Sequence, residues 1–353
     1  MQTQGTFGIY KYQENFRLER GGSLPGLDIA YHTYGTLNAE GDNCIWVCHA
    51  LTANSDVADW WPHTVVKRGF LDPEKYFIVC ANILGSCYGT TGPMSENPET
   101  GEPWYDTFPK LTIRDVVKAH ILLARHLGIQ NIFSLIGSSV GGFQAIEWAI
   151  TEPRRFKSLV LIATAAYASP WTIAIDETQR MAIFADKSYG EKRADAGAEG
   201  LAAARALGLL TYRGGSGYNL TQQDEHTDEV AEYHRACSYQ RYQGEKLVKR
   251  FDAYSYVAIL DTFDTHNVGR GRGGIKEALR RIECPTLCVG ITTDIIFTPE
   301  EMEELSACIP HSIYKEISSQ FGHDGFLVEH ELLNSLIKDF FASLPSQPHP
   351  HNP

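Results

Sequence analysis

The stretch that decides the fold is Asn131-Ile-Phe-Ser-Leu-Ile-Gly137-Ser138-Ser139-Val140-Gly141-Gly142. In it an apolar run meets a Gly-x-Ser-x-Gly sequence and passes directly into a helical pattern. A strand–turn–helix unit of this kind holds a nucleophilic serine on a sharp turn with its hydroxyl exposed. Only Ser139 fits the frame, since Ser138 would need a glycine where Ile136 stands. The stretch predicts Ser139 as a nucleophile, and the alternative is a serine- and glycine-rich turn without chemistry.

Two glycines flank this serine at positions that leave no room for a side chain. A Cβ on Gly137 or Gly141 would collide with the neighbouring strand or helix, so both positions favour glycine. A serine hydroxyl is a poor nucleophile by itself. The prediction therefore depends on finding a base, an acid and oxyanion donors elsewhere in the chain.

The composition restricts the class of protein. The chain has 353 residues, 43% of them hydrophobic, and a formal net charge of −12. This length suits one large α/β domain with an insertion, or two modest domains. The negative charge argues against a general nucleic-acid or membrane-surface binder. The eight cysteines lack the paired spacing of a metal site, so we expect no metal.

The amino terminus and the apolar runs indicate a cytoplasmic protein. Met1-Gln-Thr-Gln-Gly has neither the basic region nor the apolar segment of a secretory signal. No apolar stretch has the length needed to cross a bilayer. Cysteines such as Cys44, Cys48 and Cys80 fall in runs that we interpret as buried strands, where free cysteine behaves as a small hydrophobe.

Strands and helices alternate on both sides of the opening stretch. Cys44–Cys48, Tyr76–Ala81 and Ser158–Ile162 are continuous apolar runs of the kind that suits a parallel sheet covered on both faces. Thr112-Ile-Arg-Asp115 has the form of a capping box and begins a helix that Gly128 ends. This order predicts an α/β fold, with a mostly parallel sheet and helices on both faces.

The alternation stops after Ala168. Residues 169–280 have little strand signal, and we interpret them as a helical lid with helices at Gly200–Gly208 and Glu229–Tyr242. The core then comprises residues 1–168 and 281–345. The predicted elements of the returning core and the terminus are strands at Pro285–Ile291 and Ser312–Ile317, an amphipathic helix at 328–343, and a disordered tail at 346–353.

Two further residues complete a candidate triad. The arrangement resembles the α/β-hydrolase fold, in which serine, acid and histidine follow one another along the chain. Asp294 comes directly after the strand ending at Ile291, and His323 follows the last strand. Both lie at carboxyl ends of strands, where such sheets bind ligands. We predict that Asp294 orients His323 and that His323 removes the proton of Ser139.

Two backbone N–H groups are expected to form the oxyanion hole. One belongs to Val140, the residue after the nucleophile. The second should come from the loop His49-Ala50-Leu51-Thr52, and Leu51 is the candidate. An ordinary loop after a strand is the alternative for this segment.

At this point the chain resembles the homoserine O-acetyltransferase family, over almost its whole length. The segments that carry the resemblance are Cys48–Thr52, Trp60-Trp61, Asn82–Pro93, Phe108–Asp115, Gly137–Gly142, Ala204-Arg205 with Thr211-Tyr212-Arg213, Arg250–Tyr256 and Gly322–Leu327. The resemblance implies an α/β-hydrolase fold and a step of methionine biosynthesis. Family members act by ping-pong acyl transfer, with acetyl-CoA as co-substrate and no bound cofactor.

The resemblance also assigns the acceptor site and the partners. Arg205 would pair with the carboxylate of the amino acid, Tyr212 would assist, and Asp324 would hold the ammonium group. The partners would be the small molecules acetyl-CoA and L-homoserine, and the family implies a homodimer formed through lid helices. For Arg205 the alternative is a solvated face of an Ala-rich helix.

Several residues near the acyl site differ from the family's usual ones. Ser138 replaces a glycine, Val140 replaces Met or Leu, and Ala53 begins a segment that departs from the common Thr-Gly. These differences leave the acyl donor open between acetyl-CoA and succinyl-CoA, and the acceptor between homoserine and serine. An esterase or other hydrolase on the same fold is a further alternative.

Overall fold

An eight-stranded sheet forms the centre of the protein, in a computed structural model that describes residues 4–225, 230 and 233–345. The strand order is β1-β4-β6-β5-β9-β10-β11-β12, and the strands from β6 to β12 are parallel. Their bounds are β1 Thr6–Tyr12, β4 Leu27–Tyr34, β5 Cys44–Cys48, β6 Phe77–Ala81, β9 Ser134–Ser138, β10 Leu159–Ile162, β11 Thr286–Ile291 and β12 Ser312–Ile317. Two short ribbons pair β2 (Phe16–Arg17) with β3 (Ser23–Leu24), and β7 (Glu96–Asn97) with β8 (Glu102–Pro103).

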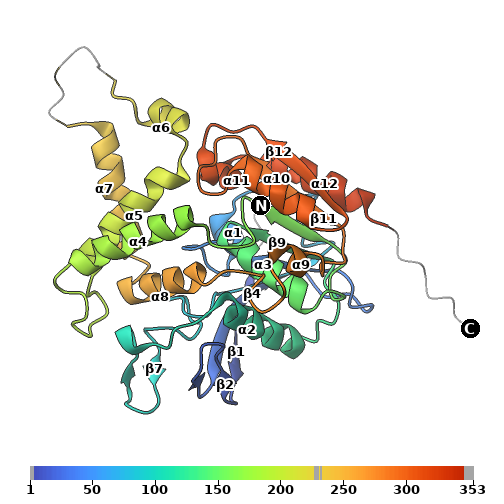
Figure 1. Cartoon of the computed structure of the whole chain (residues 1–353), viewed down its shortest axis with the longest axis horizontal. Helices are drawn as coiled ribbons and strands as arrows, with labels where there is room; N and C mark the ends of the chain where they lie inside the picture. The colour runs from blue at the N-terminus through green and yellow to red at the C-terminus, as the bar shows by residue number, and fades with distance from the viewer. Residues whose placement is uncertain (1–3, 226–229, 231–232, 346–353) are drawn as a thin grey trace, which may run out of the picture.

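Helices cover both faces of this sheet and extend to one side of it (Figure 1). Those of the first and last parts of the chain are α1 Val57–Trp60, α2 Ile113–His126, α3 Val140–Thr151, α9 Ile275–Leu279, α10 Pro299–Cys308, α11 Gly325–Val328 and α12 His330–Ser343. Those between β10 and α9 are α4 Pro170–Ala185, α5 Ala198–Tyr212, α6 Gly215–Gln222, α7 Arg235–Val248 and α8 Ala253–Asp264. Short 3-10 turns span Tyr105–Thr107 and Gly322–Asp324.

The side chains of β5 show why the sheet needs helices on both faces. Trp46 packs into one apolar cluster, together with residues of α2, α3 and α10. Ile45 and Val47 pack into another cluster, with residues of α1 and α12. Because successive side chains of a strand point to opposite faces, an entirely apolar strand must be buried on both.

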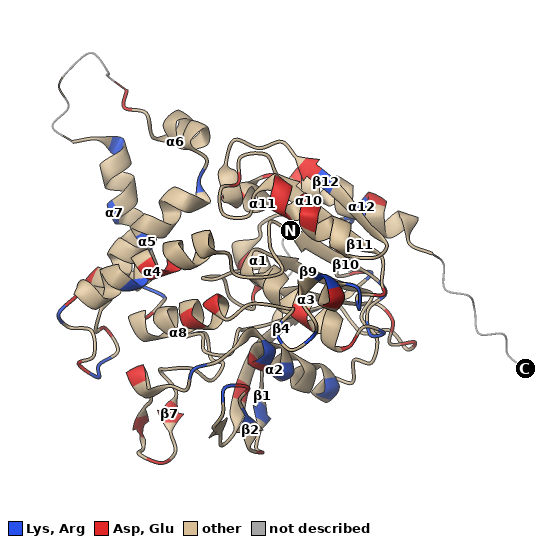
Figure 2. Ribbon diagram, viewed as in Figure 1, with Lys and Arg blue, Asp and Glu red and all other residues tan. Residues whose placement is uncertain are grey.

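The start of α2 follows the capping rule read from the sequence. Thr112 accepts a hydrogen bond from the Asp115 N–H, and the Asp115 side chain accepts one from the Thr112 N–H. These two bonds satisfy backbone donors that have no partner within the helix. Figure 2 marks acidic residues along α10 and basic residues along α2.

The helices between β10 and α9 lie beside the sheet, to the left in Figure 1. The predicted helix at Gly200–Gly208 lies within α5. The predicted helix at Glu229–Tyr242 is wrong in its bounds, because α7 runs from Arg235 to Val248. The Asp224 carboxylate accepts a hydrogen bond from the Arg235 N–H at 2.7 Å and so caps the helix there. Residues 226–229 and 231–232 lie outside the described residues, as does the predicted tail at 346–353.

Two further properties of the chain are the apolar character of its helices and the burial of its cysteines. In the part of the chain that the structure describes, no helix has the length and apolar character needed to span a membrane. Cys44, Cys48, Cys80 and Cys288 are free and buried within strands, as the apolar runs around them predict.

Candidate active site

Ser139 lies on a strained turn between β9 and α3. Its φ is 54° and its ψ is −131°, a conformation that residues with a side chain rarely adopt. Two hydrogen bonds hold the turn: the Ser139 N–H donates to Ile162 O at 2.9 Å, and Thr164 Oγ1 donates to Ser139 O at 2.7 Å. Strand β10 and the residues after it therefore hold the strained turn, from which the Ser139 hydroxyl reaches His323.

The glycines around the serine are needed for packing. A Cβ on Gly137 would overlap the backbone of Gly141, and a Cβ on Gly141 would overlap Cys48 O at the end of β5. Backbone atoms cannot move aside as a flexible side chain can. The close approach of α3 to the sheet therefore requires glycine at both positions.

Ser139, His323 and Asp294 form a chain of hydrogen bonds. His323 Nε2 lies 2.8 Å from Ser139 Oγ, and His323 Nδ1 lies 2.7 Å from Asp294 Oδ2. The other oxygen, Asp294 Oδ1, accepts the N–H groups of Ile296 and Phe297 at 2.8 and 3.2 Å. The structure thus brings together the three residues that the sequence predicts, from the ends of β9, β11 and β12.

The charges around His323 favour a basic imidazole. Burial lowers the pKa of His323, but the charge of Asp294 and its hydrogen bond, together with the charge of Asp324, outweigh that effect. The pKa of His323 therefore lies above its ordinary value. When Asp294 Oδ2 accepts from Nδ1–H, the unprotonated Nε2 faces the Ser139 hydroxyl.

The two predicted oxyanion donors lie beside the serine. Leu51 and Val140 both line the cavity into which Ser139 opens. The loop before Leu51 is held by the buried ring of His49, whose Nε2 accepts the Ile83 N–H at 3.1 Å. Its Nδ1 in turn donates to Ala50 O at 2.9 Å. Since burial also lowers the pKa of His49 to about 4, this ring is neutral and in one tautomer.

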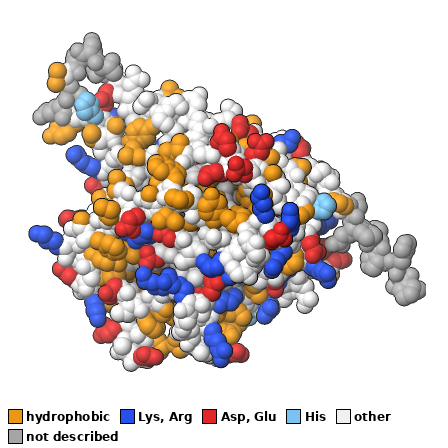
Figure 3. Space-filling view, in the orientation of Figure 1, with side chains coloured by type: hydrophobic (Ala, Val, Ile, Leu, Met, Phe, Trp, Pro, Cys, Tyr) orange, Lys and Arg blue, Asp and Glu red, His pale blue; other side chains and the backbone are white. Residues whose placement is uncertain are grey.

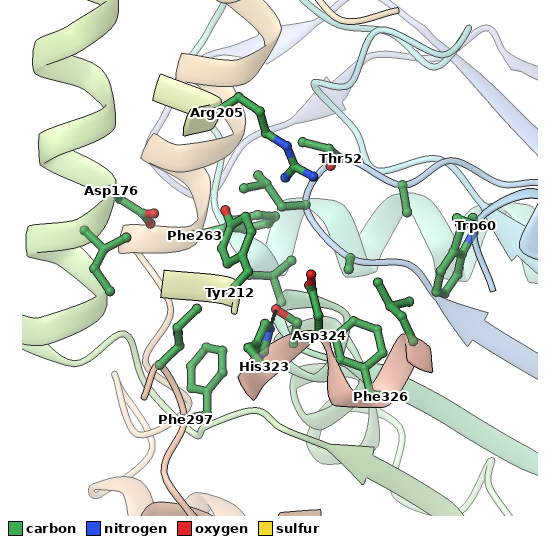
Figure 4. A pocket seen from close by; sticks show the side chains of 18 of the residues that line it. Thr52, Trp60, Asp176, Arg205, Tyr212, Phe263, Phe297, His323, Asp324 and Phe326 are labelled. Carbon is green, nitrogen blue, oxygen red and sulfur yellow. Dashed lines mark hydrogen bonds between the residues drawn. The ribbon is translucent and has the colours of Figure 1, made fainter. Parts of the chain in front are cut away.

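A cavity of about 460 Å³ lies above the hydrogen-bonded chain. Figure 4 shows Arg205 and Asp324 pointing toward one another across it, with Tyr212 beside them and His323 below. Arg205 stacks over the Tyr212 ring, with Cζ 5.5 Å from the ring centroid. The three residues that the resemblance assigns to the acceptor therefore face the same space as Ser139.

Asp324 is already paired in this structure. Its Oδ2 lies 2.7 Å from Nε of Arg213, in the loop after α5. Burial raises the pKa of Asp324, while the charges of Arg213, His323 and Arg205 oppose that effect. Because a carboxylate has two oxygens, the ion pair with Arg213 fixes its orientation and leaves Oδ1 for a ligand.

Four charged residues of the cavity wall were not assigned a role from the sequence, and one of them is Asp59 of α1. Asp176 comes from α4, Lys246 from α7 and Arg250 from the loop after α7. Nη1 of Arg250 donates to Thr52 O at 2.5 Å, which ties this loop to the segment that follows Leu51. Only the fold brings these helices to the cavity, so periodicity along the chain offers no signal for them.

The cavity holds no candidate metal centre among the residues described. Within residues 4–225, 230 and 233–345, no group of three or more His, Cys, Asp or Glu side chains is arranged to bind a metal ion.

Comparison with known proteins gives the family. Residues 44–330 match the family model of the alpha/beta hydrolase fold. The homoserine O-acetyltransferase of Cyclobacterium marinum is 45% identical over 333 residues, which cover 94% of each chain. This chain belongs to the homoserine O-acetyltransferase family. Both the family and the α/β-hydrolase fold that the sequence predicts are thereby confirmed.

Solved structures place this fold among enzymes with more than one activity. The homoserine O-acetyltransferase from Bacillus anthracis has a TM-score of 0.88 at 22% identity, covering 98% of this chain and 99% of that one. Esterase E22 has a TM-score of 0.87, also at 22% identity, covering 96% and 100%. At such identities the likeness shows the fold alone, and an acyltransferase and an esterase share it with this family member.

Proposed function

We propose that this protein transfers an acetyl group from acetyl-CoA to the hydroxyl of L-homoserine, through an acyl-Ser139 intermediate. The observation that carries the proposal is the hydrogen-bonded chain of Ser139, His323 and Asp294 beneath a cavity with Arg205 and Asp324 in its wall. Family membership supports the choice of reaction, which is a step of methionine biosynthesis.

In the first half-reaction Ser139 becomes acetylated. Its Oγ attacks the thioester carbon as His323 Nε2 takes the hydroxyl proton. The carbonyl oxygen becomes an oxyanion that the N–H groups of Leu51 and Val140 stabilise. When the carbon–sulfur bond breaks, the CoA sulfur leaves with the proton held by His323, and acetyl-Ser139 remains.

In the second half-reaction the acetyl group moves to the acceptor. His323 removes the proton of the homoserine hydroxyl, whose oxygen attacks the acyl carbon. The second tetrahedral intermediate uses the same two N–H groups. Ser139 Oγ then leaves and recovers the proton from His323, so that the enzyme returns to its starting state.

The charges of the cavity fit an amino acid as acceptor. Arg205 presents a guanidinium that can bind a carboxylate through two N–H groups. Asp324 offers the oxygen that Arg213 leaves unused to an ammonium group. Opposite charges that face one another across the cavity match the two ends of a zwitterion (Figure 4).

Two other functions use the same residues. An esterase would let water replace the alcohol, and it would have no use for the opposite charges of Arg205 and Asp324 in the cavity wall, so these charges favour a transferase. A homoserine O-succinyltransferase or a serine O-acyltransferase would differ only in the donor or the acceptor. Ala53 and Val140, which line the cavity, and Ser138, which precedes the nucleophile, are the residues that would decide between these activities.

We further divide the chain into an α/β-hydrolase core, residues 1–168 and 281–345, and a helical lid, residues 169–280. The lid exposes large apolar side chains, which Figure 3 shows gathered over this side of the molecule. They include Trp171, Met181, Phe184, Leu210, Leu220 and Tyr242, each more than half exposed. This surface supports a homodimer formed through lid helices, which light scattering would test. We assign the reaction to the cytoplasm.

A thiol-release assay tests the proposal. Acetyl-CoA and succinyl-CoA are each supplied with homoserine, with serine and without an acceptor. We expect rapid thiol release only with acetyl-CoA and homoserine, and none with the Ser139→Ala variant. Equal release without an acceptor would make the protein a thioesterase, and faster release with succinyl-CoA would change the donor.

A further inference from the structure

A buried glutamine connects the two backbone segments that carry the proposed oxyanion donors. Gln144 lies on α3, one turn after Val140, and is completely buried. Its Nε2 donates to His49 O at 3.3 Å and to Val140 O at 3.2 Å. His49 precedes Leu51 by two residues in the same loop, and Val140 is itself one of the proposed donors. One amide group thus bridges both halves of the hole.

The orientation of this amide is fixed by a second buried histidine. Nε2 of His120, on α2, donates to Gln144 Oε1 at 2.9 Å. Burial lowers the pKa of His120 to about 4, so the ring is neutral and its single proton lies on Nε2. The ring packs against both Trp46 and Trp148, at centroid distances of 5.8 and 6.0 Å. The Gln144 side-chain oxygen faces the N–H of His120, and the Gln144 NH₂ group faces two carbonyl oxygens. The Gln144 amide therefore has one satisfactory orientation.

The loop on the other side of the hole is equally constrained. The ring of His49 binds the Ile83 N–H and Ala50 O, which prevents the loop from rotating. The amide of Gln144 then sets the distance between this loop and the start of α3. Gly141 lies directly between them and allows the close approach.

We propose that Gln144 is a positioning residue for the oxyanion hole: it holds the His49–Leu51 loop and the Val140 turn at the spacing that the tetrahedral intermediate requires. This inference rests on the proposed acylation of Ser139. Donors of such a hole act only when they lie within about 2.7–3.1 Å of the developing oxyanion. Losing the bridge leaves both donors in place but loosens their separation, so acylation slows while substrate binding is preserved.

The experiment uses Gln144→Leu, which removes the amide but keeps similar volume. Acylation is followed with p-nitrophenyl acetate and with acetyl-CoA, and binding of a trifluoromethyl ketone is measured, because its adduct with Ser139 places an oxyanion in the hole. We expect kcat to fall about 10- to 100-fold, with KM within twofold of the wild type. The affinity for the ketone should fall by the same factor as kcat, while the affinity for free CoA is unchanged.

Thr286→Val is the matched control, since Thr286 is a buried polar residue whose hydroxyl binds Cys284 O at the start of β11, away from the site. A folded Gln144→Leu variant with kcat and ketone affinity within twofold of this control overturns the inference. If that variant does not fold, Gln144→Glu decides, because it keeps an oxygen for His120 and loses the amino group. The same loss of kcat supports the proposal, and unchanged kcat overturns it. A wild-type protein that is never acylated would overturn both this inference and the proposed function.

Discussion

Replacing Asp294 by Asn should invert the hydrogen bonding of His323. In the wild type Asp294 Oδ1 accepts two backbone N–H groups, from Ile296 and Phe297, and Oδ2 faces His323 Nδ1. An asparagine keeps its oxygen on the two N–H groups, because turning the amide would lose both bonds, each worth about 1 kcal/mol. Its NH₂ group then faces Nδ1, which becomes the acceptor. The ring proton then lies on Nε2 and points at Ser139 Oγ. In that state Nε2 can no longer accept the proton of Ser139.

This change removes the base while it leaves the fold intact. The same exchange of Asp for Asn in a serine protease triad lowers kcat about 10⁴-fold, and a similar loss is expected here. That factor corresponds to about 5.4 kcal/mol of transition-state stabilisation at 1.36 kcal/mol per decade. Single-turnover release of thiol from acetyl-CoA measures it, with the melting temperature as a check on folding. An Asp294→Asn variant that keeps more than a tenth of the wild-type acylation rate would refute this role of Asp294.

Three further predictions concern pH, the acceptor and the packing of the turn. The pKa of His323 is raised, and His323 must be neutral to act as a base. The kcat/KM for acylation should therefore fall as the pH drops through a pKa higher than that of an ordinary histidine. A pH profile without this loss would contradict the role of His323 as the base. Asp324→Asn should spare acylation within about threefold but raise KM for homoserine about 10- to 100-fold, as expected for a lost charged hydrogen bond; normal transfer kinetics would remove Asp324 from the acceptor site. Gly141→Ala should lower the free energy of unfolding by about 3 kcal/mol or more, because the new methyl group would overlap Cys48 O. Gly215→Ala adds its methyl group in open space and should change that free energy by less than about 0.5 kcal/mol. Urea titration compares the two variants.

The sheet was predictable from local patterns. Cys44–Cys48 and Ser312–Ile317 match β5 and β12 residue for residue, since both begin and end where turn residues meet apolar or β-branched runs. The start of α2 was predictable for another local reason, because its capping box lies within four residues. The chain order of Ser139, Asp294 and His323 was sufficient to find the hydrogen-bonded chain, because each follows a strand whose end lies at one edge of the sheet.

The parts that could not be predicted depend on contacts between distant segments. Helix α7 begins at Arg235, where Asp224 accepts the backbone N–H. The periodicity of apolar residues cannot reveal a capping residue that lies 11 residues earlier in the sequence. The ion pair of Arg213 with Asp324 joins residues that lie far apart in the sequence. The sequence places His120 in a helix and gives it no partner. Its bond to Gln144 becomes visible only when α2 and α3 pack together.

The acetylated serine itself provides the most direct test. Wild-type protein is mixed with acetyl-CoA without an acceptor, quenched on the millisecond scale, digested and analysed by mass spectrometry. We predict one acetyl group on the peptide that contains Ser139, formed at least as fast as overall turnover. It should be discharged to O-acetylhomoserine when homoserine is added. An unmodified Ser139 peptide during active turnover, or an acetyl group that homoserine does not remove, would contradict the proposed mechanism.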